Sequence, residues 1–157
     1  MVPFTYVSGL IFIFYLITNN PYIESVSLNC AIGVLFGFKS AILIDNEGYK
    51  KCVGQSISIN RITPRQFVGM DILMHGSPVV YFLFNKSLYN IKYLNQALIT
   101  SVSIHVVWAI LTCRGLNLNK IYLDKCDYQL CDRQWHKMWI CTLIGHSVPH
   151  ILYVIMK

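Results

Sequence analysis

Three apolar segments of the chain each contain a pair of polar residues, four positions apart, that ends in histidine. Side chains at this spacing lie on one face of a helix. An ionisable group near the middle of an apolar segment is costly, by about 2.5–3.5 kcal/mol for Asp, so it usually marks a function. The spacing therefore predicts a histidine-centred polar site that several helices share inside a bundle. The three pairs are Asp71 with His75, Ser101 with His105, and His146 with His150.

Acid–base chemistry is the first use that these residue types suggest. The Asp71 carboxylate could accept a hydrogen bond from one imidazole nitrogen of His75 and so fix its tautomer, which leaves the other nitrogen to activate a hydroxyl or a water. Ser77, Ser101 or Ser103 could be the nucleophile, although none lies in a recognised nucleophile motif. The candidate catalytic residues are therefore His75, Asp71, Ser77, Ser101 and His105.

A cofactor site is the second hypothesis, because neutral imidazole is the commonest metal ligand. A bis-histidine haem or a metal ion would use His75, His105 and either of the last pair, His146 or His150, with Asp71 as a ligand or as a hydrogen-bond partner of a ligand. The chain lacks the dense histidine clusters of membrane di-iron enzymes. We therefore expect no cofactor first and keep haem or metal, with His146 and His150 as cofactor-binding residues, as the alternative.

A purely structural role is the third hypothesis. Neutral histidines could bond to one another and to nearby hydroxyls across helices and so hold the bundle together. Hydrogen bonds of this kind average only about 0.6 kcal/mol, which is a small return for the cost of inserting the polar groups.

The composition indicates a membrane protein. The chain has 157 residues, of which 55% are hydrophobic and 13% are charged, whereas an ordinary soluble domain has about 25% charged residues. A helix needs about 20 apolar residues to cross a hydrocarbon core. We therefore expect an all-α, integral membrane bundle that forms a single domain over residues 1–157. Its five transmembrane helices are predicted over 3–22, 25–45, 66–85, 94–113 and 138–156.

The basic residues indicate an orientation rather than a nucleic-acid site. The net charge is +6, but the lysines and arginines lie in the gaps between apolar runs and form no dense cluster. Most of them fall in 46–65 and 114–137, so the positive-inside rule places the N-terminus on the cytoplasmic side. The expected partners are membrane lipids and proteins in the same membrane, and no nucleic acid.

Small residues and prolines predict how the helices pack. Gly33 and Gly37 form a small-xxx-small pattern that would let a neighbouring helix approach closely. Pro78 and Pro149 each follow a histidine by three residues. A proline inside a helix leaves the carbonyl four residues earlier without its donor, so each should create an additional polar group near a histidine.

Thiols in the loop before the last helix are a separate candidate site. Cys126, Cys131 and His136, together with Cys52, could supply four zinc ligands, although the spacing is not that of a common zinc module. We expect these to be solvated thiols. A disulfide between Cys126 and Cys131 becomes the alternative if the loop faces away from the cytoplasm.

Residues 67–124 resemble a known family. They contain HGSPVVYFLF, then Trp108, Arg114-Gly115 and the run Ile121-Tyr122-Leu123, and this order resembles the androgen-induced membrane hydrolase family and the related bacterial Pr6Pr-type membrane proteins. The resemblance implies an intramembrane threonine hydrolase that acts on fatty-acid esters of hydroxy fatty acids. It places His75 at the family's catalytic histidine. The family's threonine lies on an earlier helix, and residues 25–45 contain none.

Lipid-ester hydrolysis, or a related small intramembrane reaction, is therefore the leading functional hypothesis. The alternative from another class is a non-enzymatic membrane scaffold or assembly subunit, in an organelle complex or a virion membrane. The two differ in what the central histidines do: an enzyme needs His75 for activity, whereas a scaffold needs the histidines for stability or assembly.

Overall fold

The computed structural model of the protein is all-α, as predicted, and its described residues contain no strand. The structure describes residues 4–44, 46–47, 50, 53–54, 57–58, 61–85, 93–114 and 135–156. The helices in this part of the chain are α1 (Phe4–Thr18), α2 (Pro21–Ile44), α4 (Pro64–Phe84), α5 (Leu94–Arg114) and α8 (Trp135–Met156).

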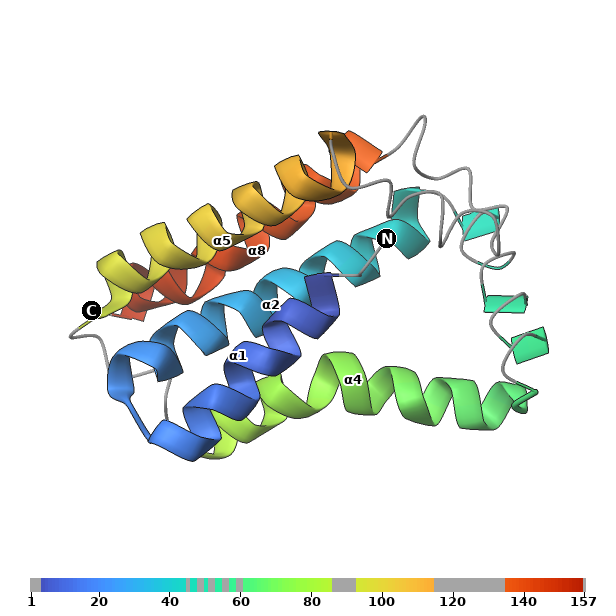
Figure 1. Cartoon of the computed structure of the whole chain (residues 1–157), viewed down its shortest axis with the longest axis horizontal. Helices are drawn as coiled ribbons and strands as arrows, with labels where there is room; N and C mark the ends of the chain where they lie inside the picture. The colour runs from blue at the N-terminus through green and yellow to red at the C-terminus, as the bar shows by residue number, and fades with distance from the viewer. Residues whose placement is uncertain are drawn as a thin grey trace.

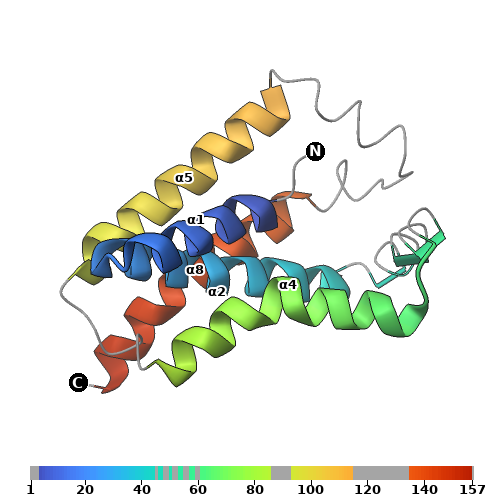
Figure 2. The ribbon, with the colours of Figure 1, turned by 60° about the horizontal axis from the view of Figure 1, so that its bottom comes forward.

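Helix α2 is the centre of the bundle. It packs against α1, α4, α5 and α8, and its most extensive contact is with α8 (Figure 1). Every residue from 25 to 34 is buried, so the middle of α2 is enclosed on all sides. Helix α4 lies on one side of α2, and α5 and α8 lie on another (Figures 1 and 2). The position of each candidate residue therefore depends on which side of α2 its helix occupies.

The contact between α2 and α8 depends on glycines. A Cβ atom at Gly33 would lie 2.9 Å from the His146 ring, and one at Gly145 would lie 2.8 Å from the Cα atom of Gly33. A Cβ atom at Gly37 would overlap the hydroxyl of Thr142. Side chains at these positions would push the helices apart, so the close packing that the Gly33 and Gly37 spacing predicts is confirmed.

Helix α1 is shorter than the sequence indicated. We expected a helix over 3–22, but α1 ends at Thr18 because Asn19 adopts a left-handed conformation with φ of 48°. The Asn20 side chain then accepts a hydrogen bond from the backbone N–H of Tyr22 at 2.9 Å, which caps the start of α2. Fifteen helical residues rise about 22 Å. Helix α1 therefore covers only part of the length of α2.

Helix α4 starts two residues earlier than predicted because it has a complete N-terminal cap. Thr63 Oγ1 accepts a hydrogen bond from the backbone N–H of Gln66 at 3.2 Å, and Gln66 Oε1 accepts one from the backbone N–H of Thr63 at 2.8 Å. Pro64 occupies the first helical position, where its missing N–H costs nothing. Before this cap, the described residues Ile57 and Ser58 are helical.

Within the part of the chain that the structure describes, two helices are long and apolar enough to cross a membrane, namely α4 and, within α5, Leu94–Leu111. Helices α1 and α8 contain the shorter apolar segments Thr5–Thr18 and Ile140–Ile155. Large apolar side chains are exposed on several helices, among them Ile17, Leu43 and Phe84. Faces of this kind are unusual on soluble monomers and suit a lipid environment.

The first prediction tests the glycine contact. The substitution Gly37→Leu should lower the free energy of unfolding in detergent by about 1–3 kcal/mol, because the new side chain overlaps Thr142 and overpacks the seam between α2 and α8. The matched control is Gly69→Leu on α4, where a Cβ atom would have open space, and it should not destabilise the protein. Thermal unfolding of the purified variants measures both. Equal stability of the two variants would contradict the packing described here.

Candidate functional site

The histidines form two groups rather than the single shared site that we expected. His75 on α4 contacts α1, whereas His105 on α5 and His146 on α8 contact each other. Helix α4 packs mainly against α1 and α2, so α2 lies between the two groups (Figures 1 and 2). We expected a shared site because each histidine lies near the middle of its helix. That position does not determine which side of α2 the helix occupies.

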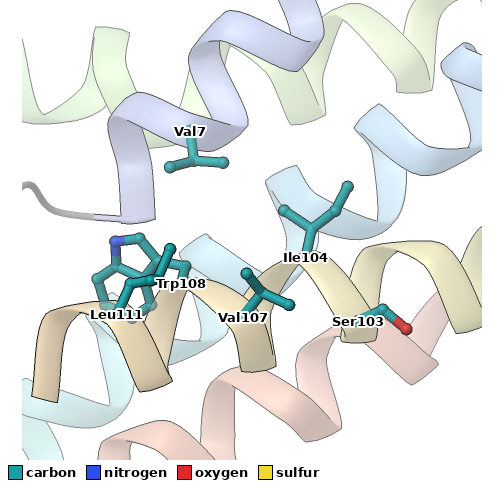
Figure 3. Close-up of a pocket in the computed structure, with 6 residues that line it drawn as sticks. All are labelled: Val7, Ser103, Ile104, Val107, Trp108 and Leu111. Atoms are coloured by element: carbon teal, nitrogen blue, oxygen red, sulfur yellow. The ribbon is translucent and has the colours of Figure 1, made fainter. Parts of the chain in front are cut away.

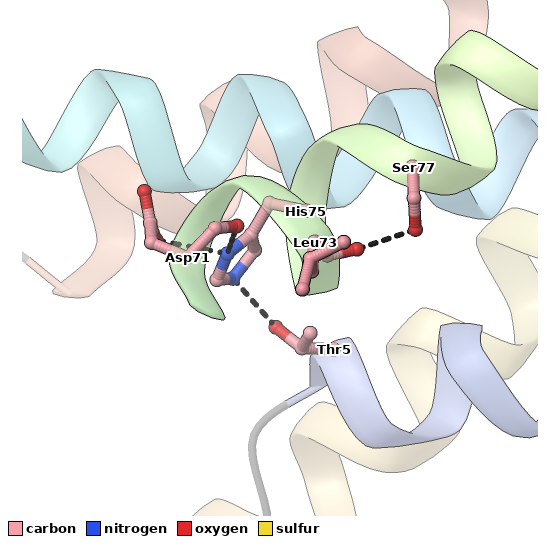
Figure 4. A network of polar contacts seen from close by, with 5 residues as sticks. All are labelled: Thr5, Asp71, Leu73, His75 and Ser77. Atoms are coloured by element: carbon pink, nitrogen blue, oxygen red, sulfur yellow. Dashed lines mark hydrogen bonds and ion pairs between the residues drawn. The ribbon is translucent and has the colours of Figure 1, made fainter. Parts of the chain in front are cut away.

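The first group joins Asp71, His75 and Thr5. The Asp71 carboxylate oxygen Oδ1 lies 3.0 Å from His75 Nδ1, and the backbone carbonyl of Asp71 lies 3.1 Å from the same nitrogen. On the other side of the ring, Thr5 Oγ1 lies 3.2 Å from His75 Nε2. Figure 4 shows Thr5 of α1 pointing toward the imidazole of α4. The imidazole therefore has a carboxylate at one nitrogen and a hydroxyl at the other.

This arrangement fixes the tautomer of the ring. If Nδ1 carries the proton and donates it to Asp71, Nε2 is an acceptor and the Thr5 hydroxyl can donate to it. In activated nucleophiles, a hydroxyl contacts a base, and a third group holds that base in its orientation. The His75 and Asp71 side chains are 16% and 12% exposed, so a second molecule could still reach the site.

Thr5 is the residue that sequence reasoning missed. It lies 70 residues before His75, and no spacing rule connects residues so far apart. The resemblance indicated a threonine on an earlier helix but not this one. Thr5 is already helical, because α1 begins at Phe4, and the packing of α1 against α4 places it beside the middle of α4.

The candidate nucleophile Ser77 does not face His75. Its exposed hydroxyl donates to the backbone carbonyl of Leu73 within α4 (Figure 4). Two residues along a helix correspond to a rotation of about 200°, so Ser77 and His75 point to nearly opposite faces. The structure therefore does not bring this serine together with the histidine.

The second group is buried at the junction of α2, α5 and α8. His105 Nδ1 lies 3.1 Å from His146 Nε2, and the two rings are perpendicular. Both side chains are almost fully buried, with 2% and 0% exposure. The edge of the Trp108 ring packs against His105, with ring centroids 5.5 Å apart. Ser101, one turn before His105, is buried and donates to the carbonyl of Leu98 at 3.0 Å, so it does not reach His75.

The geometry of the second group does not fit a bis-histidine haem. A bis-histidine haem would need room for the porphyrin between the two ligating nitrogens. His105 and His146 are instead in direct contact, and Gly33 closes against the His146 ring. Within the described residues, no three His, Cys, Asp or Glu side chains come together as metal ligands. The loop thiols Cys126 and Cys131 lie outside the described residues.

An apolar groove lies between α1 and α5 (Figure 3). Its volume is about 360 Å³, which is at the lower end of the range for small-molecule sites, about 300–1,000 Å³. Ser103, the third candidate nucleophile, lies at one end of the groove, and Trp108 and Leu111 lie at the other end. The surface that lines the groove is apolar. The lining residues are Val7, Ser103, Ile104, Val107, Trp108 and Leu111.

Comparisons of the chain with protein-family models, with curated proteins and with solved structures found no match. The resemblance of residues 67–124 to the androgen-induced membrane hydrolases therefore stays a prediction. Function has to be inferred from the residues and their geometry.

The second prediction tests the division into two groups by double-mutant cycles. Replacing His105 and His146 by Leu, singly and together, should give a coupling free energy of about 0.6–1.7 kcal/mol, because the two rings share a hydrogen bond. The matched cycle of His75→Leu with His146→Leu should be additive within about 0.5 kcal/mol, because these residues lie in different groups. Unfolding in detergent measures both cycles. A large coupling between His75 and His146 would restore the single shared site.

Proposed function

We propose that the protein is a multipass membrane protein in which Thr5, His75 and Asp71 form an intramembrane hydrolase site for lipid esters. One observation carries the proposal: the same imidazole has the Asp71 carboxylate 3.0 Å from Nδ1 and the Thr5 hydroxyl 3.2 Å from Nε2. This order of acid, base and nucleophile is that of the catalytic triad found in many ester hydrolases. The resemblance to the androgen-induced membrane hydrolases independently suggests a threonine and this histidine.

The membrane part of the proposal rests on the helices. The two helices of spanning length, α4 and α5, support it, as do the exposed apolar side chains around the bundle. We propose that all five helices lie in the bilayer, with the N-terminus on the cytoplasmic side as the basic residues indicate. Since Thr5 contacts a residue near the middle of α4, the site would then lie well inside the hydrocarbon layer.

The proposed reaction has two steps, each with its proton accounted for. The Thr5 oxygen attacks the ester carbonyl while its proton passes to His75 Nε2, and Asp71 stabilises the imidazolium that forms. The imidazolium then protonates the leaving alkoxide, which departs as an alcohol and leaves an acyl-threonine. A water gives its proton to His75 and attacks the acyl group. Thr5 takes the proton back as the fatty acid is released.

A lipid ester suits this environment better than a water-soluble one. The site is half-buried on the face that α1 and α4 share, and exposed apolar side chains on α4 would contact acyl chains directly. The groove between α1 and α5 has an almost entirely apolar lining and could hold one chain. Esters of hydroxy fatty acids, which the resemblance suggests, combine a buried ester with two such chains.

A non-enzymatic scaffold or assembly subunit is the second candidate function. The observation that favours it is the second group, in which His105 and His146 bond to each other inside the core instead of facing a site for a substrate. Polar residues in that position can serve to hold three helices together. The two candidates differ in the expected effect of removing His75.

The third prediction tests the nucleophile. A fluorophosphonate probe should label the detergent-purified protein, and the substitutions Thr5→Ala and His75→Ala should each lower the labelling rate at least about 100-fold, because the nucleophile or its base is lost. Thr5→Ser should keep the reaction. Ser77→Ala and Ser101→Ala are the matched controls and should label normally, since neither hydroxyl contacts His75. Mass spectrometry should place the adduct on Thr5.

Two results would count against the hydrolase. Labelling that persists in Thr5→Ala would assign the nucleophile elsewhere. A protein that is not labelled, and that loses thermal stability in His75→Ala, would favour the scaffold. Thermal unfolding of every variant, run beside the labelling assay, separates a lost reaction from a lost fold.

A further inference from the structure

Polar atoms that the proposed site does not use are buried on α2 and α8 without a hydrogen bond. Asn29 of α2 is 1% exposed, and neither its amide nitrogen nor its amide oxygen has a hydrogen-bond partner. The Nδ1 atom of His150 on α8 is buried and is also without one. Buried amides and imidazoles are nearly always hydrogen-bonded, because each unmatched group costs about 1–3 kcal/mol.

The packing of α2 against α8 places these two groups at the same level. Gly37 faces Thr142 and, one turn earlier on α2, Gly33 faces His146, so the helices run antiparallel. One further turn toward the start of α2 reaches Asn29, and one further turn toward the end of α8 reaches His150. The backbone carbonyl of Asn29 also lies beside the His146 ring. Asn29 therefore lies at the level of both His146 and His150.

Pro149 adds a third polar group at this level. It lies inside α8, so the carbonyl of Gly145 has no helical N–H to bond to. Gly145 is buried against α2, in contact with Gly33. A proline also bends its helix and opens the backbone around it. The seam thus has an amide donor, an amide acceptor, an imidazole nitrogen and a carbonyl within about one turn.

We propose that this part of the seam binds a water molecule between Asn29 and His150, and that the water connects His150 to the His146–His105 pair for proton transfer. Water fits because it donates and accepts at once and is small enough for a helix interface. A cation is a poorer fit, because no carboxylate lies among the groups named. The inference is independent of the hydrolase proposal, since it uses none of Thr5, His75 or Asp71.

The proton transfer needs no other reagent. A neutral imidazole has one donor and one acceptor nitrogen. The water can accept a proton from one imidazole and give one of its own protons to the next imidazole. At the end of the transfer it is again a water molecule. The hydrogen bond of 3.1 Å between His146 Nε2 and His105 Nδ1 extends the path by one more ring. Chains of this kind inside membranes are typical proton relays.

The fourth prediction tests the water site with Asn29→Leu, which keeps the number and branching of the side-chain heavy atoms and removes both polar atoms. In nanodiscs with ¹⁵N-labelled histidine, the wild-type protein should show magnetisation transfer from water to the ring N–H groups of His146 and His150. In Asn29→Leu, ring exchange should slow at least about ten-fold, which corresponds to about 1.4 kcal/mol, the order of one lost hydrogen-bonded contact. Thermal unfolding should also show a loss of stability.

The matched control is Ser27→Ala. Ser27 is also fully buried on α2, and its hydroxyl has no hydrogen-bond partner, but it lies on a different face from Asn29. Its removal should leave histidine exchange unchanged. The inference is overturned if the wild-type rings receive no magnetisation from water. It is also overturned if Asn29→Leu stabilises the protein and leaves exchange unaltered. A protein gains stability when an apolar group replaces a buried amide that has neither a water nor another hydrogen-bond partner.

Discussion

The close approach of α2 and α8 is the constraint on which the rest of the bundle depends. Gly33, Gly37 and Gly145 leave room for the His146 ring and the Thr142 side chain where any Cβ atom would collide. Small residues of this kind let two helix backbones approach closely, so that van der Waals packing holds the helices together. The seam fixes α8 on α2, and α8 in turn holds His146 against His105 of α5. The buried histidine pair is thus a consequence of small residues on another helix.

The opposite side of α2 is built on a different principle. There, aromatic rings pack edge to face, with Phe12 of α1 against Tyr81 and Phe82 of α4 at centroid distances of 5.3 and 5.6 Å. Such pairs are directional and hold two helices at a defined angle. The rings join the middle of α1 to the C-terminal end of α4, and Thr5 and His75 meet one to two turns earlier on the same two helices. The two sides therefore hold their histidines by different means, and each can vary without the other.

Much of the fold was predictable from the sequence, because length and apolar content decide where helices form. The shared face of Asp71 and His75 follows from their spacing alone, and so does the glycine seam. The end of α1 was only partly predictable: Asn19, Asn20 and Pro21 signal a turn, but the left-handed conformation of Asn19 decides where it falls. The contact between Thr5 and His75 was not predictable, because tertiary packing brings together residues of two helices. The same holds for Asn29, whose burial gives no signal in a single sequence.

The position of Thr5 in the first turn of α1 has a consequence for how the site opens. Terminal turns have fewer internal hydrogen bonds than the middle of a helix and separate from their neighbours at lower free energy. Asp71 and His75 lie in the middle of α4 and stay together, because four residues of one helix link them. Local opening of the bundle would therefore take the hydroxyl away and leave the carboxylate and imidazole as a preformed pair. The hydroxyl is the adjustable part of the three, because it alone belongs to a terminal turn.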